Sequence, residues 1–180
     1  LYANGPHAAT GQYLVGDQNL GKERAWSGDL SLRYKDGTDH GSVGVFYSSF
    51  ANYLAETNTG RYRNDDGDVV AAGDDGALPE ARYQGVSARL YGLEAENVTR
   101  ILQRDGHALD LGLSGDYTVS RNRDTGRSLP RIPPLRLRVA LDYGYGPYSA
   151  GVSVSKAFAQ HDHPANDTST PGYYSLDANA

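Results

Sequence analysis

Strict period-two alternation of apolar and polar residues is the feature that most constrains the fold of this chain. Between residues 135 and 143 every second residue is apolar, and the pattern returns over residues 148–155 after the break Gly-Tyr-Gly-Pro. Such alternation on both sides of a short break predicts two antiparallel strands joined by a tight turn. One face of this hairpin is aliphatic, whereas the other carries Arg136, Arg138 and Asp142.

The same alternation recurs along the whole chain, while helical periodicity is weak throughout. Strands are predicted at residues 25–34, 43–53, 82–101, 107–119, 135–143, 148–155 and 173–180. We therefore expect an all-β protein, an antiparallel up-and-down meander of about seven strands.

The connections between these strands come in two lengths. The short ones are residues 35–40, 104–106 and 144–147, and the long ones are residues 54–81, 121–134 and 160–172. Short and long alternate strictly, which gathers all short turns at one end of the meander and all long loops at the other. Short periplasmic turns opposite long extracellular loops are typical of an outer-membrane β-barrel, so we interpret the chain as a fragment of one. Seven strands are too few to close it, because bacterial single-chain barrels have an even number of at least eight.

Aromatic residues support the membrane interpretation. One group flanks the short turns: Tyr34, Tyr143, Tyr145 and Tyr148. A second group lies near the opposite strand ends: Trp26, Tyr47, Tyr53, Tyr117, Phe158 and Tyr174. Two bands of amphipathic rings fit two membrane interfaces, although the turn at residues 104–106 contributes no aromatic residue.

Composition narrows the alternatives. Only 38% of the residues are apolar and 3 are Phe, which disfavours the packed core of a soluble β-sandwich. A soluble extracellular β-sandwich that binds carbohydrate or a cation remains the second hypothesis, and a non-transporting barrel the third. A net charge of −5 argues against nucleic acid as a partner. The chain has no cysteine and no hydroxyl nucleophile with a positioned base, so we expect no enzymatic activity.

The alternation also assigns side chains to the two surfaces of the expected barrel wall. The predicted lumen-facing residues are Asp29, Arg33, Glu94, Glu96, Asp110, Asp116, Arg136, Arg138 and Asp142. The predicted lipid-facing residues are Leu109, Leu111, Leu113, Leu135, Leu137, Val139, Leu141, Val152 and Val154. Among the charged residues, we expect Arg136, Arg138 and Asp142 to pair with Asp110 and Asp116.

Three stretches resemble the C-terminal part of the barrel of TonB-dependent outer-membrane receptors. They are "GDQNLGKE" (residues 16–23), the spaced Gly92, Glu94 and Glu96, and "LPRIPP" (residues 129–134). Because "YANGPHAAT" and a histidine-bearing loop accompany them, the chain most resembles the ZnuD-like zinc-uptake receptors.

This resemblance implies an active-transport receptor in the bacterial outer membrane. Its extracellular loops would capture a scarce ligand, such as zinc, an iron-siderophore or haem, for uptake driven by the TonB complex. The expected partners are outer-membrane lipid, TonB through a plug domain, and the small ligand or metal. Residues 1–180 are then one partial receptor barrel, without the plug domain and the final strands. No cofactor is required, and zinc would be a transported ligand.

Histidines in the expected extracellular loops are the candidate metal ligands. The stretch "AQHDHPAND" holds His161, Asp162 and His163, with Asp167 close behind, and His7 lies in another expected extracellular segment. In an extended chain the two imidazoles of His161 and His163 point the same way, and imidazole with carboxylate suits Zn²⁺. The acidic stretch of residues 64–75 lacks the Gly and Glu positions of an EF-hand, so we interpret it as a solvated loop.

Overall fold

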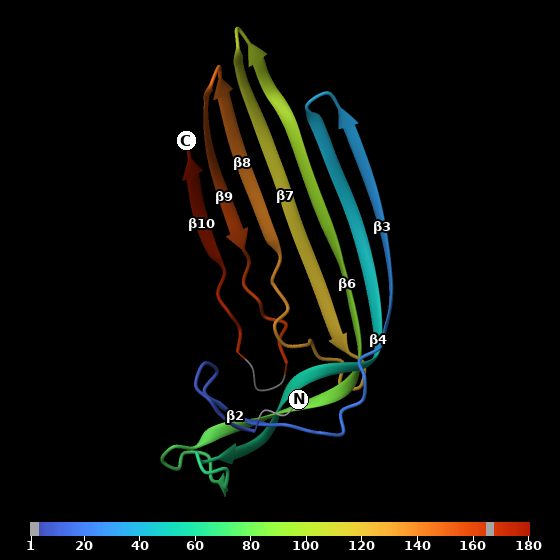
Figure 1. Cartoon of the computed structure of the whole chain (residues 1–180), viewed down its shortest axis with the longest axis vertical. Coiled ribbons are helices and arrows are strands. Elements are labelled where there is room, and N and C mark those ends of the chain that lie inside the picture. The colour runs from blue at the N-terminus through green and yellow to red at the C-terminus, as the bar shows by residue number, and fades with distance from the viewer. Residues whose placement is uncertain (1–3, 165–167) are drawn as a thin grey trace.

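The described residues form a single ten-stranded sheet and contain no helix (Figure 1). The computed structural model describes residues 4–164 and 168–180. The strands are β1 (Gly5–His7), β2 (Gln12–Val15), β3 (Ala25–Asp36), β4 (Asp39–Arg63), β5 (Val69–Val70), β6 (Leu78–Arg104), β7 (His107–Asn122), β8 (Arg136–Tyr145), β9 (Tyr148–Ala157) and β10 (Tyr173–Asn179). Accordingly, residues 4–164 and 168–180 hold no helix that is long and apolar enough to cross a membrane.

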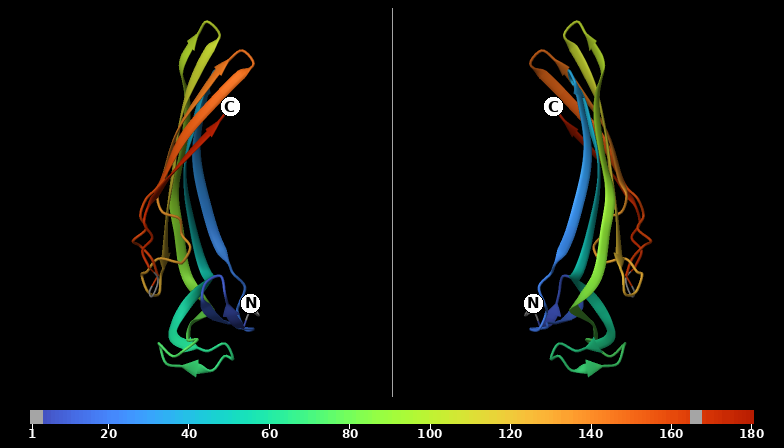
Figure 2. Two further views of the ribbon diagram at one scale, coloured as in Figure 1. Left: turned by 90° about the vertical axis from the view of Figure 1, so that its left-hand side faces the viewer. Right: turned by 90° about the vertical axis from the view of Figure 1, so that its right-hand side faces the viewer.

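Seven of these strands make a curved antiparallel wall, as the alternation predicts. β3, β4, β6, β7, β8, β9 and β10 each pair with the next strand in that order. The wall is open, with β3 and β10 at its two edges, and the side views show its curvature (Figure 2). The all-β class and the open meander are therefore confirmed.

All three short connections are two-residue hairpin turns gathered at one end of the wall (Figure 1). Asp105 and Gly106 have φ values of 51° and 82°, and positive φ at both central positions is the type I′ turn that Asp-Gly favours. Gly37 and Gly146 occupy the first central position of the other two turns with φ of 59° and 57°. The strands thus reach further into the turns than the 35–40 and 144–147 boundaries predict.

The predicted loop at residues 54–81 is wrong, because most of it continues the sheet. β4 and β6 run on as a long hairpin past two register shifts, Phe50/Tyr53 and Asn58/Tyr62, and β5 pairs with the end of β4. The chain's start joins this hairpin, since β2 pairs with β6 in parallel, the one exception among the described strand pairs. The unit formed by β1, β2, β5, residues 54–63 and residues 78–86 is called the arm below (lower part of Figure 1).

A small apolar cluster lies where the arm meets the wall. Ala55, Val86, Ala88 and Leu129 are buried, and four half-buried side chains pack against them: Phe50, Tyr53, Leu90 and Ile132. Tyr53 therefore belongs to this cluster and not to an aromatic band, which corrects the prediction for that residue. The Phe50 and Tyr53 rings meet edge to face, with centroids 5.1 Å apart.

Candidate functional site

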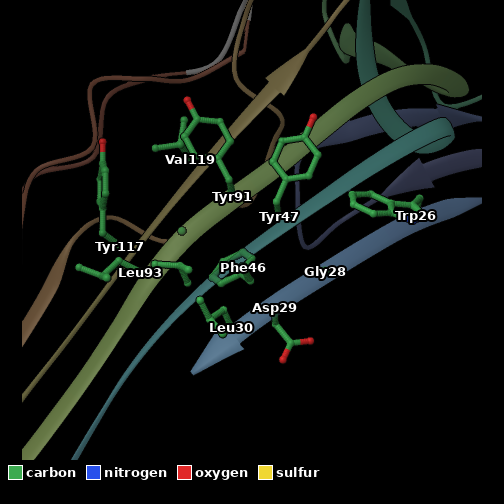
Figure 3. A pocket seen from close by; sticks show the side chains of 12 residues that line it. Trp26, Gly28, Asp29, Leu30, Phe46, Tyr47, Tyr91, Leu93, Tyr117 and Val119 are labelled. Carbon is green, nitrogen blue, oxygen red and sulfur yellow. The ribbon is translucent and has the colours of Figure 1, made fainter. Parts of the chain in front are cut away.

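The wall has one charged face and one apolar face. Because cross-strand partners share a face, the register puts all nine predicted lumen-facing residues on one side, which we call the polar face. The predicted lipid-facing residues lie on the opposite side, the apolar face, with Leu135 directly before β8 continuing the β8–β9 ladder. Figure 3 shows this division: Tyr47 and Tyr91 rise from one side of the strands and Asp29 points away from the other.

The apolar face is exposed and is bounded by aromatic rings. Leu32 and Leu176 are more than 70% exposed, at 73% and 72%. At the long-loop end, Tyr47 stacks on Tyr91 with ring centroids 6.5 Å apart, and Trp26 lies beside Tyr47 (Figure 3).

His107, directly after the turn at residues 104–106, supplies the aromatic ring that this turn itself lacks. The His107 ring stacks on Tyr145 at 4.2 Å, and its Nδ1 lies 2.5 Å from the Tyr143 hydroxyl. From His107 to Tyr117 is ten residues of β7, which at about 3.4 Å per residue and a tilt of roughly 40° spans about 26 Å. That matches the roughly 25 Å apolar band of outer-membrane barrels.

Ion pairs cross-link the polar face. Arg136 Nε donates to both Asp116 oxygens at 3.0 and 3.1 Å, as expected. Asp110 instead receives two hydrogen bonds from Arg100, at 2.6 and 2.9 Å, and Arg138 donates to Ser153 at 3.0 Å. Two ion pairs, Arg136–Asp116 and Arg100–Asp110, therefore link neighbouring strands on this face.

A polar cavity of about 540 Å³ opens at the long-loop end, between the arm and residues 122–131. We call it the loop-end cavity. Gln12 of β2, Glu56 of β4 and Gln84 of β6 line one side, and Arg127 and Arg131 line the other. Hydroxyl and amide side chains supply most of the remaining lining, together with the apolar Ala55, Leu129, Pro130 and Pro164. The cavity therefore offers many hydrogen-bond donors and acceptors but only two cations and one carboxylate. Such a donor set suits an anionic or oxygen-rich organic ligand.

The "LPRIPP" segment positions one of these cations. Leu129 is only 2% exposed in the apolar cluster, and Ile132 packs against the same cluster three residues later. Arg131 lies between them with a φ of 63°, a conformation that costs a non-glycine residue roughly 1 kcal/mol or more. Its Nη2 donates to Glu56 Oε2 at 2.8 Å, and the Tyr83 hydroxyl donates to the same oxygen at 3.2 Å.

The loop around this segment is held by its own hydrogen bonds. Ser120 Oγ accepts the Leu129 amide at 2.8 Å and lies 2.9 Å from Ser128 Oγ. Asn122 Oδ1 accepts the amides of Asp124 and Thr125 at 2.9 and 3.2 Å. The cationic side of the loop-end cavity is therefore preorganised, which lowers the entropy cost of ligand binding.

A buried carboxylate stabilises the arm on the other side of the cavity. Glu80 is fully buried; Arg61 Nη2 donates to it at 2.7 Å and Arg63 Nε at 2.5 Å. Burial by itself raises the pKa of Glu80, but the hydrogen bonds from Arg63 and Arg61 outweigh it and hold that pKa below its usual value. The Arg63 guanidinium also lies 5.8 Å from the centre of the Tyr13 ring, which ties β2 to the arm.

The family model described as TonB dependent receptor-like, beta-barrel, matches residues 1–180. The chain belongs to the TonB-dependent receptor β-barrel family. Members of this family are bacterial outer-membrane transport receptors rather than enzymes.

Solved structures of TonB-dependent receptors share this fold. The copper transporter OprC matches 91% of this chain with a TM-score of 0.67 at 20% identity. The ferric enterobactin receptor PfeA of Pseudomonas aeruginosa matches 98% with a TM-score of 0.61 at 19% identity. The FrpB iron transporter of Neisseria meningitidis matches 93% with a TM-score of 0.55 at 15% identity. The chain spans about a quarter of their lengths, 25%, 26% and 25% respectively.

The histidines predicted as zinc ligands do not form a cluster among the described residues. Asp162 forms an ion pair with Arg121, and His163 Nδ1 lies 3.0 Å from the Pro164 carbonyl oxygen. His7, in β1, is hydrogen-bonded to Thr10 at 3.0 Å, and Asp167 lies outside the described residues. No group of three or more potential metal-binding side chains occurs in residues 4–164 and 168–180. Zinc, and the ZnuD-like subfamily with it, therefore stays a prediction for this TonB-dependent receptor.

Proposed function

We propose that this chain is the wall and part of the extracellular loop assembly of a receptor that captures a small ligand for TonB-driven uptake across the outer membrane. The loop-end cavity carries this proposal, because it is a preorganised polar cavity on the side where the long loops gather. The polar face then faces the lumen and the apolar face contacts outer-membrane lipid. TonB acts through a plug domain of the full-length receptor.

The chemistry of the cavity favours an anionic, oxygen-rich ligand. Arg127 and Arg131 supply guanidinium groups, and Gln12 and Gln84 supply amides. Guanidinium forms paired hydrogen bonds with carboxylates and similar oxygen pairs. The names of the structural neighbours include a ferric enterobactin receptor, and a negatively charged metal chelate of that kind suits this lining.

Free zinc is the second candidate, and it depends on different residues. His163 directly precedes the cavity-lining Pro164 and His161 lies two positions earlier, so this histidine segment adjoins the loop-end cavity. Two imidazoles supply half of a tetrahedral zinc site, and the remaining ligands would come from other parts of the receptor.

Binding measurements on the full-length receptor separate the two candidates. Ferric enterobactin and Zn²⁺ serve as probes, with Arg131→Ala, His161→Ala/His163→Ala and, as a matched control, Arg104→Ala at a short turn. We expect Arg131→Ala to weaken ferric enterobactin binding about tenfold and the other two variants to leave it unchanged. Zinc binding that is lost in the His161→Ala/His163→Ala variant would support zinc instead. Equal affinities of all variants for both probes would contradict a role for this cavity.

A further inference from the structure

Charge returns to the apolar face at the long-loop end, and there it is positive. Moving from mid-strand toward the long loops, the first charged side chain on this face is Arg89 on β6, Arg121 on β7 and Lys156 on β9. Arg24 continues the β3–β4 ladder one step beyond Ala25, which puts it on the same face as Trp26. These four cations lie on a chain whose net charge is −5, so the positive charge is local.

Arg89 and Arg121 are direct cross-strand partners. Their Cβ atoms are therefore roughly 5 Å apart on one face, where two like charges repel unless an anion lies between them. Arg121 is neutralised by Asp162, but the exposed Arg89 side chain makes no ion pair with any residue in the described part of the chain. The pair keeps one unmatched positive charge just beyond the Tyr47–Tyr91 stack.

Lys156 is a second cation of this kind, and aromatic rings hold it in place. Its Nζ lies 4.4 Å from the centre of the Tyr174 ring and 4.8 Å from that of Phe158, and it donates to the Tyr174 hydroxyl at 2.5 Å. None of the carboxylates that the structure describes lies within ion-pair distance of it. The ammonium group is therefore oriented at the level of the aromatic band without a protein counter-charge.

From this arrangement we infer that the long-loop rim of the apolar face binds the phosphate groups of lipid headgroups in the outer leaflet. Aromatic rings at the boundary of a membrane protein lie at headgroup level, so cations beside and just beyond them meet the phosphates. Guanidinium pairs with phosphate through two parallel hydrogen bonds, which suits Arg89 and Arg121. This inference rests on the proposed function for its orientation, with the long loops outside the cell.

Titration of the detergent-solubilised full-length receptor with diphosphoryl lipid A, followed by native mass spectrometry, tests the site. The variant is Arg89→Gln/Arg121→Gln, and the control is Lys35→Gln/Arg104→Gln, which removes two exposed cations at the short turns. We expect the variant to weaken lipid A binding about tenfold, the control to match the wild type, and dephosphorylated lipid A to bind the wild type as weakly as diphosphoryl lipid A binds the variant.

Two results would overturn the inference. Equal binding of diphosphoryl lipid A to the variant and the wild type would show that the arginine pair is not the site. Full competition by inorganic phosphate at matched phosphate concentration would show an anion site that does not select lipid. Uptake of ferric enterobactin by cells, measured in parallel, tests the proposed function separately. A wild-type receptor that takes up ferric enterobactin but does not bind lipid A would contradict only the lipid site.

Discussion

At the scale of single residues, Glu80 is the group whose ionisation matters most to the arm. It has two arginine partners and no exposure, so its carboxylate is stabilised in the charged form and its pKa is lowered. A carboxyl group with a lowered folded-state pKa contributes stability above its unfolded pKa of about 4.3, and that contribution is lost as the pH falls through the folded pKa. The arm should therefore loosen in acid before the wall does.

Replacing the carboxylate tests this. We expect Glu80→Gln to destabilise the arm by about 2 kcal/mol at neutral pH, because two charged hydrogen bonds are lost. The variant should also lack the opening of the arm in acid that we expect of the wild type, because the titrating carboxyl group is gone. Hydrogen exchange of residues 54–63 and 78–86 in the full-length receptor, measured from pH 7 to pH 3, reports both effects. An identical pH profile in the two proteins would show that Glu80 is not the titrating group.

Gly92 is a second position where one atom decides the packing. A Cβ there would lie 2.4 Å from the Tyr117 carbonyl oxygen and 2.6 Å from the Phe46 ring, which covers the glycine on the polar face. Gly44, on the same face of the neighbouring strand, has no atom closer than 3.8 Å to such a Cβ. We expect Gly92→Ala to cost about 1–3 kcal/mol in urea unfolding of the receptor and Gly44→Ala to cost almost nothing. Similar costs at both positions would contradict the packing of Phe46 over Gly92.

At the scale of strands, alternation predicts the wall well and the arm poorly. In the wall one face is apolar and the other polar, so most strands show a clear period of two; residues 43–53 show it less clearly, because Phe46 lies on the polar face. Beyond Tyr53 the strand reads Glu-Thr-Asn-Thr-Gly after Ala55, with polar residues on both faces, and no periodicity marks it. Its pairing depends on β6 and on the parallel contact with β2, neither of which a local pattern reveals.

The loop that carries Arg131 depends on one buried side chain. Leu129→Ala removes the centre of the apolar cluster, and we expect it to destabilise the loop by about 2–4 kcal/mol and to expose residues 123–135 to protease. Leu137→Ala is the matched control, because Leu137 is exposed on the apolar face and packs in no buried cluster of the described residues. Limited proteolysis of the detergent-solubilised receptor compares the two. Equal cleavage in both variants would show that the cluster does not hold the loop.

At the scale of the whole molecule, the sequence predicts the two faces but not the loop-end cavity. The charged and the aliphatic residues separate by alternation alone, and the register places them on opposite sides as that pattern requires. The cavity instead combines Gln12 of β2 with Gln84 of β6 and Arg131 of a loop. Those residues lie far apart in the sequence, and a parallel strand pair and a left-handed arginine bring them together. Among the cavity residues, Leu129, Pro130 and Arg131 carry a sequence signal, their place in "LPRIPP".

The exposed apolar face leads us to predict that a charge placed on it destabilises the receptor in a membrane. Leu113 lies on this face between the His107 and Tyr117 ends of the apolar band, so Leu113→Arg would place a charge near the bilayer midplane. We expect this to cost about 2–4 kcal/mol in urea unfolding of the full-length receptor from lipid vesicles, because lipid cannot solvate the guanidinium. Ser114→Arg is the control, since Ser114 is the next residue, lies on the polar face opposite Arg138, and would add its charge to a hydrated surface. If the two substitutions cost the same free energy of unfolding in vesicles, the apolar face does not contact lipid and the proposed membrane orientation is wrong.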